Sequence, residues 1–185
     1  MKTDDTIILG SKSPRRQEIL RRAGYDFKVI KLDVEESYPV DTPVHQVPVY
    51  LALKKASAYA PKPGEVLVTC DTVVILDGEV LEKPANFDEA FGMLKRLNGK
   101  EHLVVSGLCV KRTTSIKSIA DSTVVKFAEL SDGEIAQYIR QFRPYDKAGG
   151  YGVQEWMGMV GVEYIRGSFY NVMGLPIHKL YRELS

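Results

Sequence analysis

The residues best suited to chemistry lie near the start of the chain, where residues 11–16 read Ser-Lys-Ser-Pro-Arg-Arg after a short apolar run. Ser13 is a good helix N-cap and Pro14 suits the first helical position, so a helix is predicted to begin here. Helix starts favour acidic side chains because of the macrodipole, yet this turn carries Arg15 and Arg16. Free N–H groups and cations at such a turn indicate a phosphate site. Paired arginines also occur on solvated surfaces, so the segment alone leaves both interpretations open.

A single carboxylate, Asp71, interrupts the most apolar run of the chain, residues 66–76. A charged carboxylate in a buried strand is costly unless it is paired, hydrogen-bonded, metal-bound or catalytic. A capping or turn role is a poor alternative, because apolar residues flank Asp71 on both sides. Asp77-Gly78 then predicts a tight hairpin turn, and the return strand is expected to bring Lys83 next to Asp71.

A glycine-rich stretch, residues 143–154, combines three glycines with two tyrosines, an aspartate, a lysine and a final Gln154. Such a stretch is typical of backbone that approaches a ligand closely, although an ordinary glycine-rich turn has the same composition. The other polar residues that stand out along the chain are Ser11, Ser13, Arg15, Arg16, Glu36, Lys55, Asp71 and Lys83. Many cations with few carboxylates suit a polyphosphate held with a divalent metal cation, Mg²⁺ or Mn²⁺.

The elements that must position these residues follow from hydrophobic periodicity and turn signals. Helices are expected at residues 14–23, 49–59, 87–97, 131–142 and 175–184. Strands are expected at residues 6–9, 27–32, 66–76, 79–84, 101–111, 116–130 and 160–165. The stretch 38–48, which contains three prolines, and the stretch 168–174 are expected to be loops. This pattern places the cationic turn at a helix start, Asp71 within a strand and Lys55 within a helix.

Composition excludes several classes of protein. The 185 residues suffice for one domain or two small lobes with a real core. Lys and Arg number 25 against 24 Asp and Glu, so neither nucleic acid nor an anionic membrane is an expected partner. Cys70 and Cys109 lie in apolar runs and are expected to be reduced core thiols of a cytoplasmic protein. Neither a signal peptide nor a membrane-spanning stretch is expected, and the histidines lack metal-ligand spacing.

Nearly the whole chain resembles the Maf family of nucleoside triphosphate pyrophosphatases, which are relatives of the inosine triphosphate pyrophosphatases. The motifs that carry the resemblance occur in order at residues 11–16, 34–36, 51–56, 70–74, 81–84, 146–154 and 174–176. The resemblance implies a single α/β domain over residues 1–185, in which an elongated mixed β-sheet flanked by helices has a deep cleft between two lobes. It also implies hydrolysis between the α and β phosphates, which releases a nucleoside monophosphate and pyrophosphate. A homodimer and a link to inhibited septum formation are consistent with it.

Carried over position by position, the resemblance implies a role for each outstanding residue. Asp71 matches the general base, and Glu36 matches a carboxylate linked, like Asp71, to the metal. The matching phosphate-binding positions are Ser13, Arg15, Arg16, Lys55 and Lys83. The set that marks the dTTP and UTP branch is matched by Arg15, Thr72 and Gln154. Alanine is more usual in the family at the positions of Gly10, Cys70 and Gly150, and these small differences leave the implied chemistry intact, although Gly150 could loosen the base pocket.

The residues themselves support the dTTP and UTP branch only in part. A glutamine amide such as Gln154 can donate to a carbonyl oxygen and accept from the adjacent imide N–H, as uracil and thymine present them. Guanine shows the same edge, so Gln154 alone does not exclude it. Alternatives are a nucleotide-binding regulator of septum formation without turnover, a pyrophosphatase for 5-methyl-UTP or pseudo-UTP, and the 7-methyl-GTP branch, against which Gln154 argues. The regulator would need neither Asp71 nor Lys83.

Overall fold

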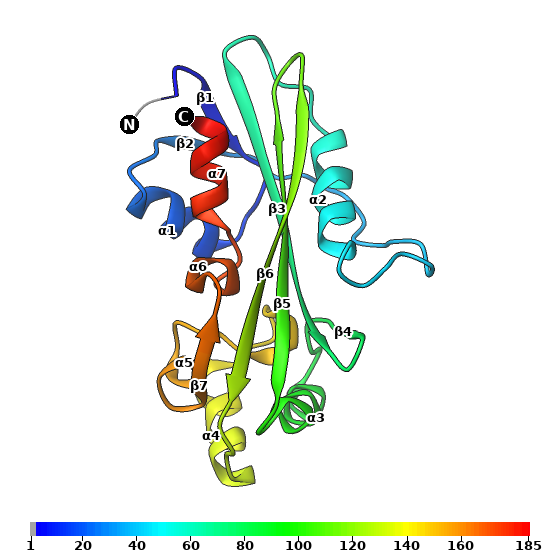
Figure 1. The fold of residues 1–185 in the computed structure, drawn as a ribbon, viewed down its shortest axis with the longest axis vertical. Coiled ribbons are helices and arrows are strands. Elements are labelled where there is room, and N and C mark those ends of the chain that lie inside the picture. The colour runs from blue at the N-terminus through cyan, green and yellow to red at the C-terminus, as the bar shows by residue number, and fades with distance from the viewer. Residues whose placement is uncertain (1–2) are drawn as a thin grey trace. The chain divides into compact units, whose positions relative to one another are not determined.

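The computed structural model describes residues 3–185, which form a mixed α/β fold (Figure 1). A seven-stranded sheet runs in the order β2-β1-β3-β5-β6-β7, with β4 paired to β3. Its strands are β1 (Thr6–Leu9), β2 (Phe27–Val29), β3 (Glu65–Leu76), β4 (Glu79–Leu81), β5 (Glu101–Lys111), β6 (Ile116–Phe127) and β7 (Val162–Arg166). β1 pairs parallel with β2 and β3, whereas the pairs β3–β4 and β6–β7 are antiparallel. The expected mixed sheet is therefore confirmed.

The chain divides into two compact units, and each is described by itself. Unit 1 comprises Met1–Thr72, Ser106–Asp121 and Gly174–Ser185, of which residues 1 and 2 lie outside the described part. Unit 2 comprises Val73–Val105 and Ser122–Met173. The single domain, the cleft between two lobes and the homodimer expected from the sequence stay predictions.

Unit 1 is built around β1 and the first part of β3, because both strands are almost wholly apolar and buried. Helix α2 (Val47–Ser57) packs on them through a cluster of buried residues, which are Ile8, Ala52, Ala56, Leu67 and Cys109. The helix lies close to β5, since a Cβ added to Gly107 would meet backbone atoms of Pro48 at 2.2 Å. Figure 1 shows α1 (Pro14–Arg22) and α7 (Ile177–Leu184) on the other side of these strands from α2. This packing fixes the helix that carries Lys55.

Unit 2 holds α3 (Phe87–Leu97), α4 (Asp132–Phe142) and β7. Helix α4 begins as predicted with a complete capping box, in which Ser131 and Glu134 bond to each other's backbone N–H. The hairpin turn before β4 is also confirmed, with positive φ angles of 52° at Asp77 and 82° at Gly78. Tyr151, within the glycine-rich stretch, is buried and packs edge-on against Phe127, with the ring centroids 4.8 Å apart.

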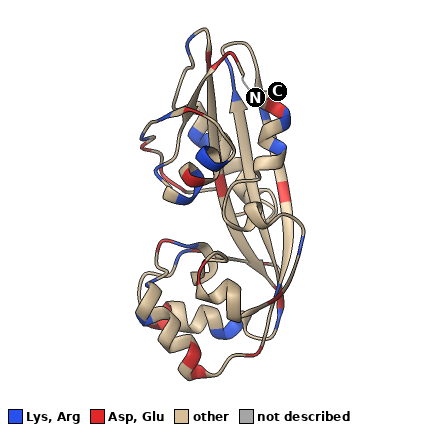
Figure 2. Ribbon diagram, turned by 90° about the vertical axis from the view of Figure 1, so that its left-hand side faces the viewer, with Lys and Arg blue, Asp and Glu red and all other residues tan. Residues whose placement is uncertain are grey.

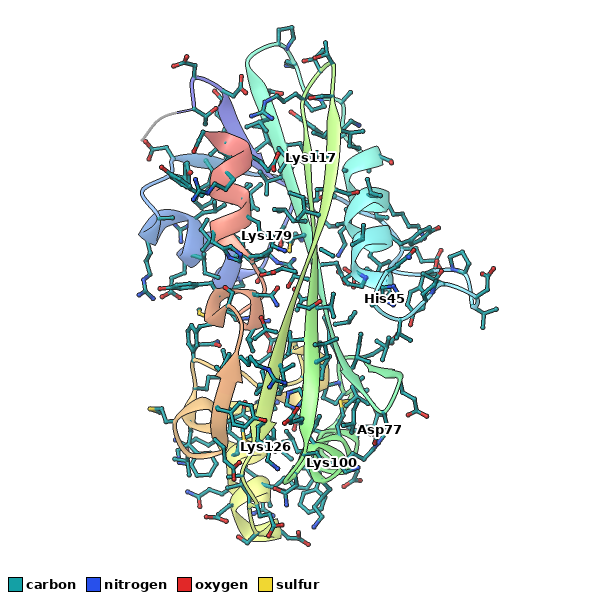
Figure 3. The ribbon with its side chains drawn as sticks, viewed as in Figure 1. His45, Asp77, Lys100, Lys117, Lys126 and Lys179 are labelled. Carbon is teal, nitrogen blue, oxygen red and sulfur yellow. The ribbon has the colours of Figure 1, made fainter. Side chains whose placement is uncertain are left out.

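Charged side chains largely pair with one another on the surface. Figure 2 shows Lys and Arg interspersed with Asp and Glu along the ribbon, in keeping with the balanced composition. Lys117 and Lys179 of unit 1 pair with Glu183 and Asp121 at 2.8 and 2.9 Å, and Lys100 of unit 2 pairs with Asp77 at 3.3 Å (Figure 3). Over residues 3–185, no helix has the length and apolar character that crossing a membrane requires. The cytoplasmic location stays a prediction.

Several element boundaries differ from those predicted. Helix α2 begins at Val47 rather than at residue 49, because Pro48 fits the first turn, where its missing N–H has no partner to lose. β2 ends at Val29 and β6 at Phe127, so both strands are shorter than expected. Three short segments were missed, namely η1 (Ala148–Gly150), α5 (Trp156–Val160) and α6 (Phe169–Val172). Helices of one turn have too little periodicity to be recognised from sequence.

Candidate active site

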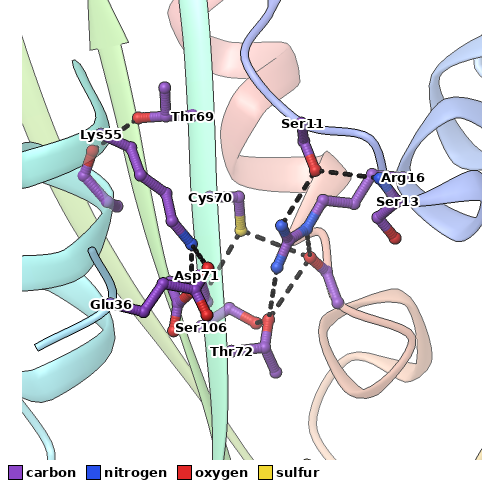
Figure 4. A network of polar contacts seen from close by, with 12 residues as sticks. Ser11, Ser13, Arg16, Glu36, Lys55, Thr69, Cys70, Asp71, Thr72 and Ser106 are labelled. Carbon is purple, nitrogen blue, oxygen red and sulfur yellow. Dashed lines mark hydrogen bonds and ion pairs between the residues drawn. The ribbon is translucent and has the colours of Figure 1, made fainter. Parts of the chain in front are cut away.

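The carboxylate predicted to be functional, Asp71, is paired with a lysine from the neighbouring helix (Figure 4). Asp71 lies in β3 and is only 8% exposed. Its Oδ1 is 2.5 Å from Nζ of Lys55, and the same ammonium lies 2.7 Å from Oε1 of Glu36. The structure thus brings together a predicted base, a predicted phosphate ligand and a predicted metal-linked carboxylate.

Helix α2 can deliver Lys55 to this place because its last two turns are anchored on the sheet. Ala52 and Ala56 are fully buried against the strands, and the Ala52 carbonyl accepts a hydrogen bond from Thr69 Oγ1 at 2.7 Å. Lys55 lies between these two anchors, and its side chain is 12% exposed. Lys54, the preceding residue, is half-buried and donates to the Ser37 carbonyl at 2.8 Å. Helix geometry therefore assigns one of two adjacent lysines to the buried carboxylate.

A second group of contacts surrounds the guanidinium of Arg16, in the first turn of α1. Its Nε donates to the Gly174 carbonyl at 2.8 Å and its Nη1 to Ser11 Oγ at 3.1 Å. A longer contact of 3.4 Å joins its Nη2 to Thr72 Oγ1 (Figure 4). Arginine carries five N–H donors, so N–H groups are left over for a phosphate after these bonds. The contacts hold the side chain in one orientation at the helix start.

The start of α1 has the features expected of an anion site. Ser13 occupies the N-cap position and Pro14 follows it, yet within residues 3–185 the Ser13 side chain makes no capping hydrogen bond. The first turn contains no acidic residue, and Arg15 and Arg16 are both half-buried there. A phosphate oxygen can therefore accept from the N–H groups and hydroxyl that the helix itself does not use.

Thr72 directly follows Asp71, and its hydroxyl points into the group around Arg16. Its Oγ1 lies 2.8 Å from Oγ of Ser106, a fully buried residue of β5, and 3.4 Å from the Gly174 carbonyl. Sequence reasoning did not single out Ser106, although a hydroxyl inside an apolar strand was a usable signal. Gly174 lies in one of the motifs that carry the family resemblance, but a motif does not show which hydrogen bonds its carbonyl accepts. Only the fold shows them.

Both cysteines are buried free thiols, as predicted. Burial raises the pKa of the Cys70 thiol, and the positive charge of Arg16 opposes that rise only in part. The thiol therefore stays protonated and donates to the Gly174 carbonyl at 3.3 Å. Burial likewise raises the pKa of Cys109 to about 11. Neither residue is set up as a nucleophile.

Two predicted site residues belong to unit 2. Lys83 is exposed and follows β4, whose pairing with β3 ends at Leu81 opposite Val74. Gln154 is exposed and follows the glycine-rich stretch. Their roles, like that of Arg15, stay predictions.

The donor set fits a divalent cation that shares its ligands with a substrate. Among residues 3–185 there is no group of three or more His, Cys, Asp or Glu side chains that could enclose a metal. Glu36 and Asp71 are nevertheless close enough to contact one ammonium. Mg²⁺ is commonly bound by one or two carboxylates together with phosphate oxygens and waters, which suits this pair.

The chain is similar to known proteins along nearly its whole length. Residues 6–185 match the family described as Maf-like protein. The chain is 50% identical to a dTTP/UTP pyrophosphatase of Bacteroides thetaiotaomicron, over 96% of this chain and 94% of that protein. It is 47% identical to a dTTP/UTP pyrophosphatase of Porphyromonas gingivalis, over 96% and 92%. Among solved structures, the Staphylococcus aureus Ham1 protein aligns with a TM-score of 0.50 at 15% identity, covering 68% of this chain and 73% of that one, which indicates a shared fold.

Proposed function

This chain belongs to the Maf-like protein family, and we propose that it hydrolyses nucleoside triphosphates, dTTP and UTP foremost, to nucleoside monophosphate and pyrophosphate. The observation that carries the proposal is the contact of Lys55 with both Asp71 and Glu36, which joins a carboxylate base to a cation suited to phosphate. Relatives 50% and 47% identical over nearly their full length, described as dTTP/UTP pyrophosphatases, support the same reaction.

In the proposed reaction, Asp71 accepts a proton from a water molecule whose oxygen forms a bond to the α-phosphorus. The bond between that phosphorus and the oxygen bridging to the β-phosphate breaks, and pyrophosphate leaves with the electron pair. Negative charge grows on the leaving group, and we assign its stabilisation to Ser13, Arg15, Arg16, Lys55 and Lys83. Lys55 can act on both the general base and the phosphate, because its ammonium already contacts Asp71.

Glu36 and Asp71 are the residues that would hold a divalent cation, Mg²⁺ or Mn²⁺. When bound, such an ion supplies charge neutralisation and polarises phosphate oxygens. The position of Lys55 beside both carboxylates keeps them oriented. Their two negative charges exceed its single positive charge, so the pair retains attraction for a further cation.

We assign selection of the nucleobase to Arg15, Thr72 and Gln154. Gln154 is exposed, so its amide is accessible to a ligand, and it can pair with the carbonyl and imide N–H of uracil or thymine. Thr72 contributes through the group around Arg16, since its hydroxyl lies 2.8 Å from Ser106 Oγ and 3.4 Å from Arg16 Nη2.

The proposal is tested by pyrophosphate release from a panel of canonical and modified nucleoside triphosphates, with Mg²⁺ or Mn²⁺. Asp71→Asn is expected to lower the rate at least about a hundredfold, the scale of general-base loss, with little change in nucleotide binding. Asp41→Asn, at an exposed loop carboxylate, is the matched control and is expected to leave the rate unchanged.

The outcomes separate the proposed reaction from its alternatives. Retained turnover in Asp71→Asn would show that Asp71 is not the general base. Binding without turnover of any nucleotide by the native protein would favour a nucleotide-binding regulator of septum formation. Higher efficiency with 5-methyl-UTP, pseudo-UTP or 7-methyl-GTP would assign the enzyme to modified nucleotides.

A further inference from the structure

The short segment that carries Gln154, residues 152–155, is held by a buried polar network in unit 2. Gln154 itself is exposed, whereas Gly152 and Val153 on one side of it are buried and Glu155 on the other is half-buried. A Cβ on Gly152 would lie 2.7 Å from the Glu155 carboxyl carbon, so the segment folds tightly back on itself. An exposed amide thus projects from backbone that is fixed on both sides.

Tyr138 of α4 contacts both ends of this segment. Its hydroxyl accepts a hydrogen bond from the Gly152 N–H at 3.0 Å and donates one to Oε2 of Glu155 at 2.7 Å. Tyr138 is 1% exposed. Burial, and then the hydrogen bond to Glu155, raise the pKa of Tyr138 far above its ordinary value, so the hydroxyl remains a donor. A single oxygen therefore bridges the residues two before and one after Gln154.

Lys147 secures the other oxygen of the same carboxylate. Its Nζ lies 3.1 Å from Oε1 of Glu155 and 2.8 Å from Oδ1 of Asp146. Lys147 is only 8% exposed, so it and Glu155 face each other away from bulk water. Screening of such a pair is weaker than at the surface. Tyr138 and Lys147 therefore orient the two oxygens of Glu155, one each.

Helix α5 packs against the same segment and against Tyr138. A Cβ on Gly158 would come within 1.7 Å of the Val153 carbonyl oxygen, so only a glycine permits this approach. Trp156 stacks on Tyr138 with ring centroids 6.2 Å apart and planes inclined by 25°. It is the only tryptophan of the chain. Its fluorescence therefore reports on the network directly.

We propose that Tyr138, Lys147 and Glu155, termed the loop clamp, are positioning residues that fix Gln154 for selection of the pyrimidine base. This inference rests on the proposed function, in which Gln154 pairs with a carbonyl and an imide N–H. Two hydrogen bonds from one amide discriminate strongly only if the amide is held in place before the base arrives, because ordering it on binding would reduce affinity. Cytosine presents a donor where uracil presents an acceptor, and a fixed Gln154 disfavours it.

The test is Tyr138→Phe, which removes one oxygen and keeps the ring. KM for dTTP and UTP is expected to rise about tenfold while kcat changes less than about threefold, and preference over CTP falls by about the same tenfold factor. Tyr164→Phe is the matched control in the same unit, because Tyr164 also donates to a glutamate, Glu101, but at the exposed surface. That control is expected to change none of these quantities.

Glu155→Gln provides a second variant should Tyr138→Phe fold poorly, because it keeps the side-chain volume and an acceptor for the tyrosine. It removes the charge that Lys147 pairs with, so the same direction of change is expected with a smaller size. Equal losses of kcat and kcat/KM for all nucleotides in both variants, without change of preference, would overturn the proposal.

A double-mutant cycle separates positioning from general damage. In a Gln154→Ala background, Tyr138→Phe is expected to cause no further loss of preference for UTP over CTP, because both changes act through one amide. Additive losses would overturn the inference. Titration of Trp156 fluorescence with the same nucleotides and Ca²⁺ in place of Mg²⁺ measures binding preference without turnover. If the native protein turns over no nucleotide, the proposed reaction fails, yet this titration still decides the clamp: equal preference in native protein and Tyr138→Phe would refute it.

Discussion

The Lys55 ammonium lies 2.5 Å from Asp71 Oδ1, and both side chains are 12% exposed. The two residues come from α2 and β3, and their pairing places a cation against the predicted base. Removing one partner of a buried pair leaves the other charge without compensation, which is a large penalty, of the order of 3–5 kcal/mol. The pair thus connects the stability of unit 1 to the proposed chemistry.

Lys55→Met is expected to lower the rate of pyrophosphate release at least about a hundredfold, because it removes a charge aimed at both base and phosphate. The free energy of unfolding should also fall, since Asp71 loses its ion-pair partner. Lys95→Met is the control, because Lys95 pairs with Asp132 at the exposed surface, where such pairs contribute about 0–1 kcal/mol. Pyrophosphate release and urea denaturation check both; native activity in Lys55→Met would contradict the assignment.

Arg16→Lys is expected to raise KM for the nucleotide about tenfold or more with the fold intact. A lysine offers its donors from one nitrogen on a flexible stem and lacks the planar fork with which two separate nitrogens of Arg16 reach the Gly174 carbonyl and Ser11, at 2.8 and 3.1 Å. The same substitution at Arg21, an exposed residue of α1 that bonds Gln17 at 3.1 Å, should leave KM unchanged. Steady-state kinetics compare the two, and an unchanged KM in Arg16→Lys would show that the fork geometry is dispensable.

The histidine His102 is expected to make unit 2 sensitive to acid. It is 4% exposed, its Nε2 is hydrogen-bonded to Tyr151 Oη at 2.7 Å, and its Nδ1 has no partner among residues 3–185. Burial lowers the pKa of His102 to about 4 from 6.5. The unfolded chain therefore binds more protons between these values, so stability falls as pH drops from about 6.5 to about 4 and levels off below.

The size of that effect follows from the difference between the two pKa values of His102, 6.5 and about 4, which corresponds to a loss of about 3–4 kcal/mol. His102→Gln keeps hydrogen-bonding capacity but does not titrate, so its free energy of unfolding should fall less between pH 7 and pH 4.5. His45→Gln, at an exposed loop residue, should follow the native protein. Urea denaturation at the two pH values measures the difference, and parallel losses in native protein and His102→Gln would exclude His102 as the cause.

Gly107→Ala is expected to destabilise the protein by about 1–3 kcal/mol or more, the range for overpacking. The added Cβ would meet the Pro48 carbonyl carbon and oxygen at 2.2 Å, and these backbone atoms cannot yield as a flexible side chain can. Gly92→Ala in α3 is the matched control, because its Cβ would meet nothing within 4 Å and alanine favours a helix. The midpoint of urea denaturation should fall for the first variant and stay or rise for the second.

Local sequence determined most of the secondary structure. The capping box at Ser131 and Glu134 and the periodic apolar face of α3 act within a few residues, so they were readable without the fold. The hairpin at Asp77-Gly78 was predicted for the same reason. The short helices α5 and α6 were not, because a single turn is stabilised by its packing rather than by its own sequence.

The sequence by itself also determined which residue types could act: a cationic helix start and one carboxylate in a buried strand. Only the tertiary structure decided which of these side chains come into contact. Lys55 reaches Asp71 across 16 positions, and Arg16 reaches the Gly174 carbonyl across 158. Such contacts depend on how helices pack on a shared sheet, a collective property of many buried side chains. Tyr138 gave no signal of its own, because the pattern that buries an α4 tyrosine does not reveal that its hydroxyl ends beside Glu155.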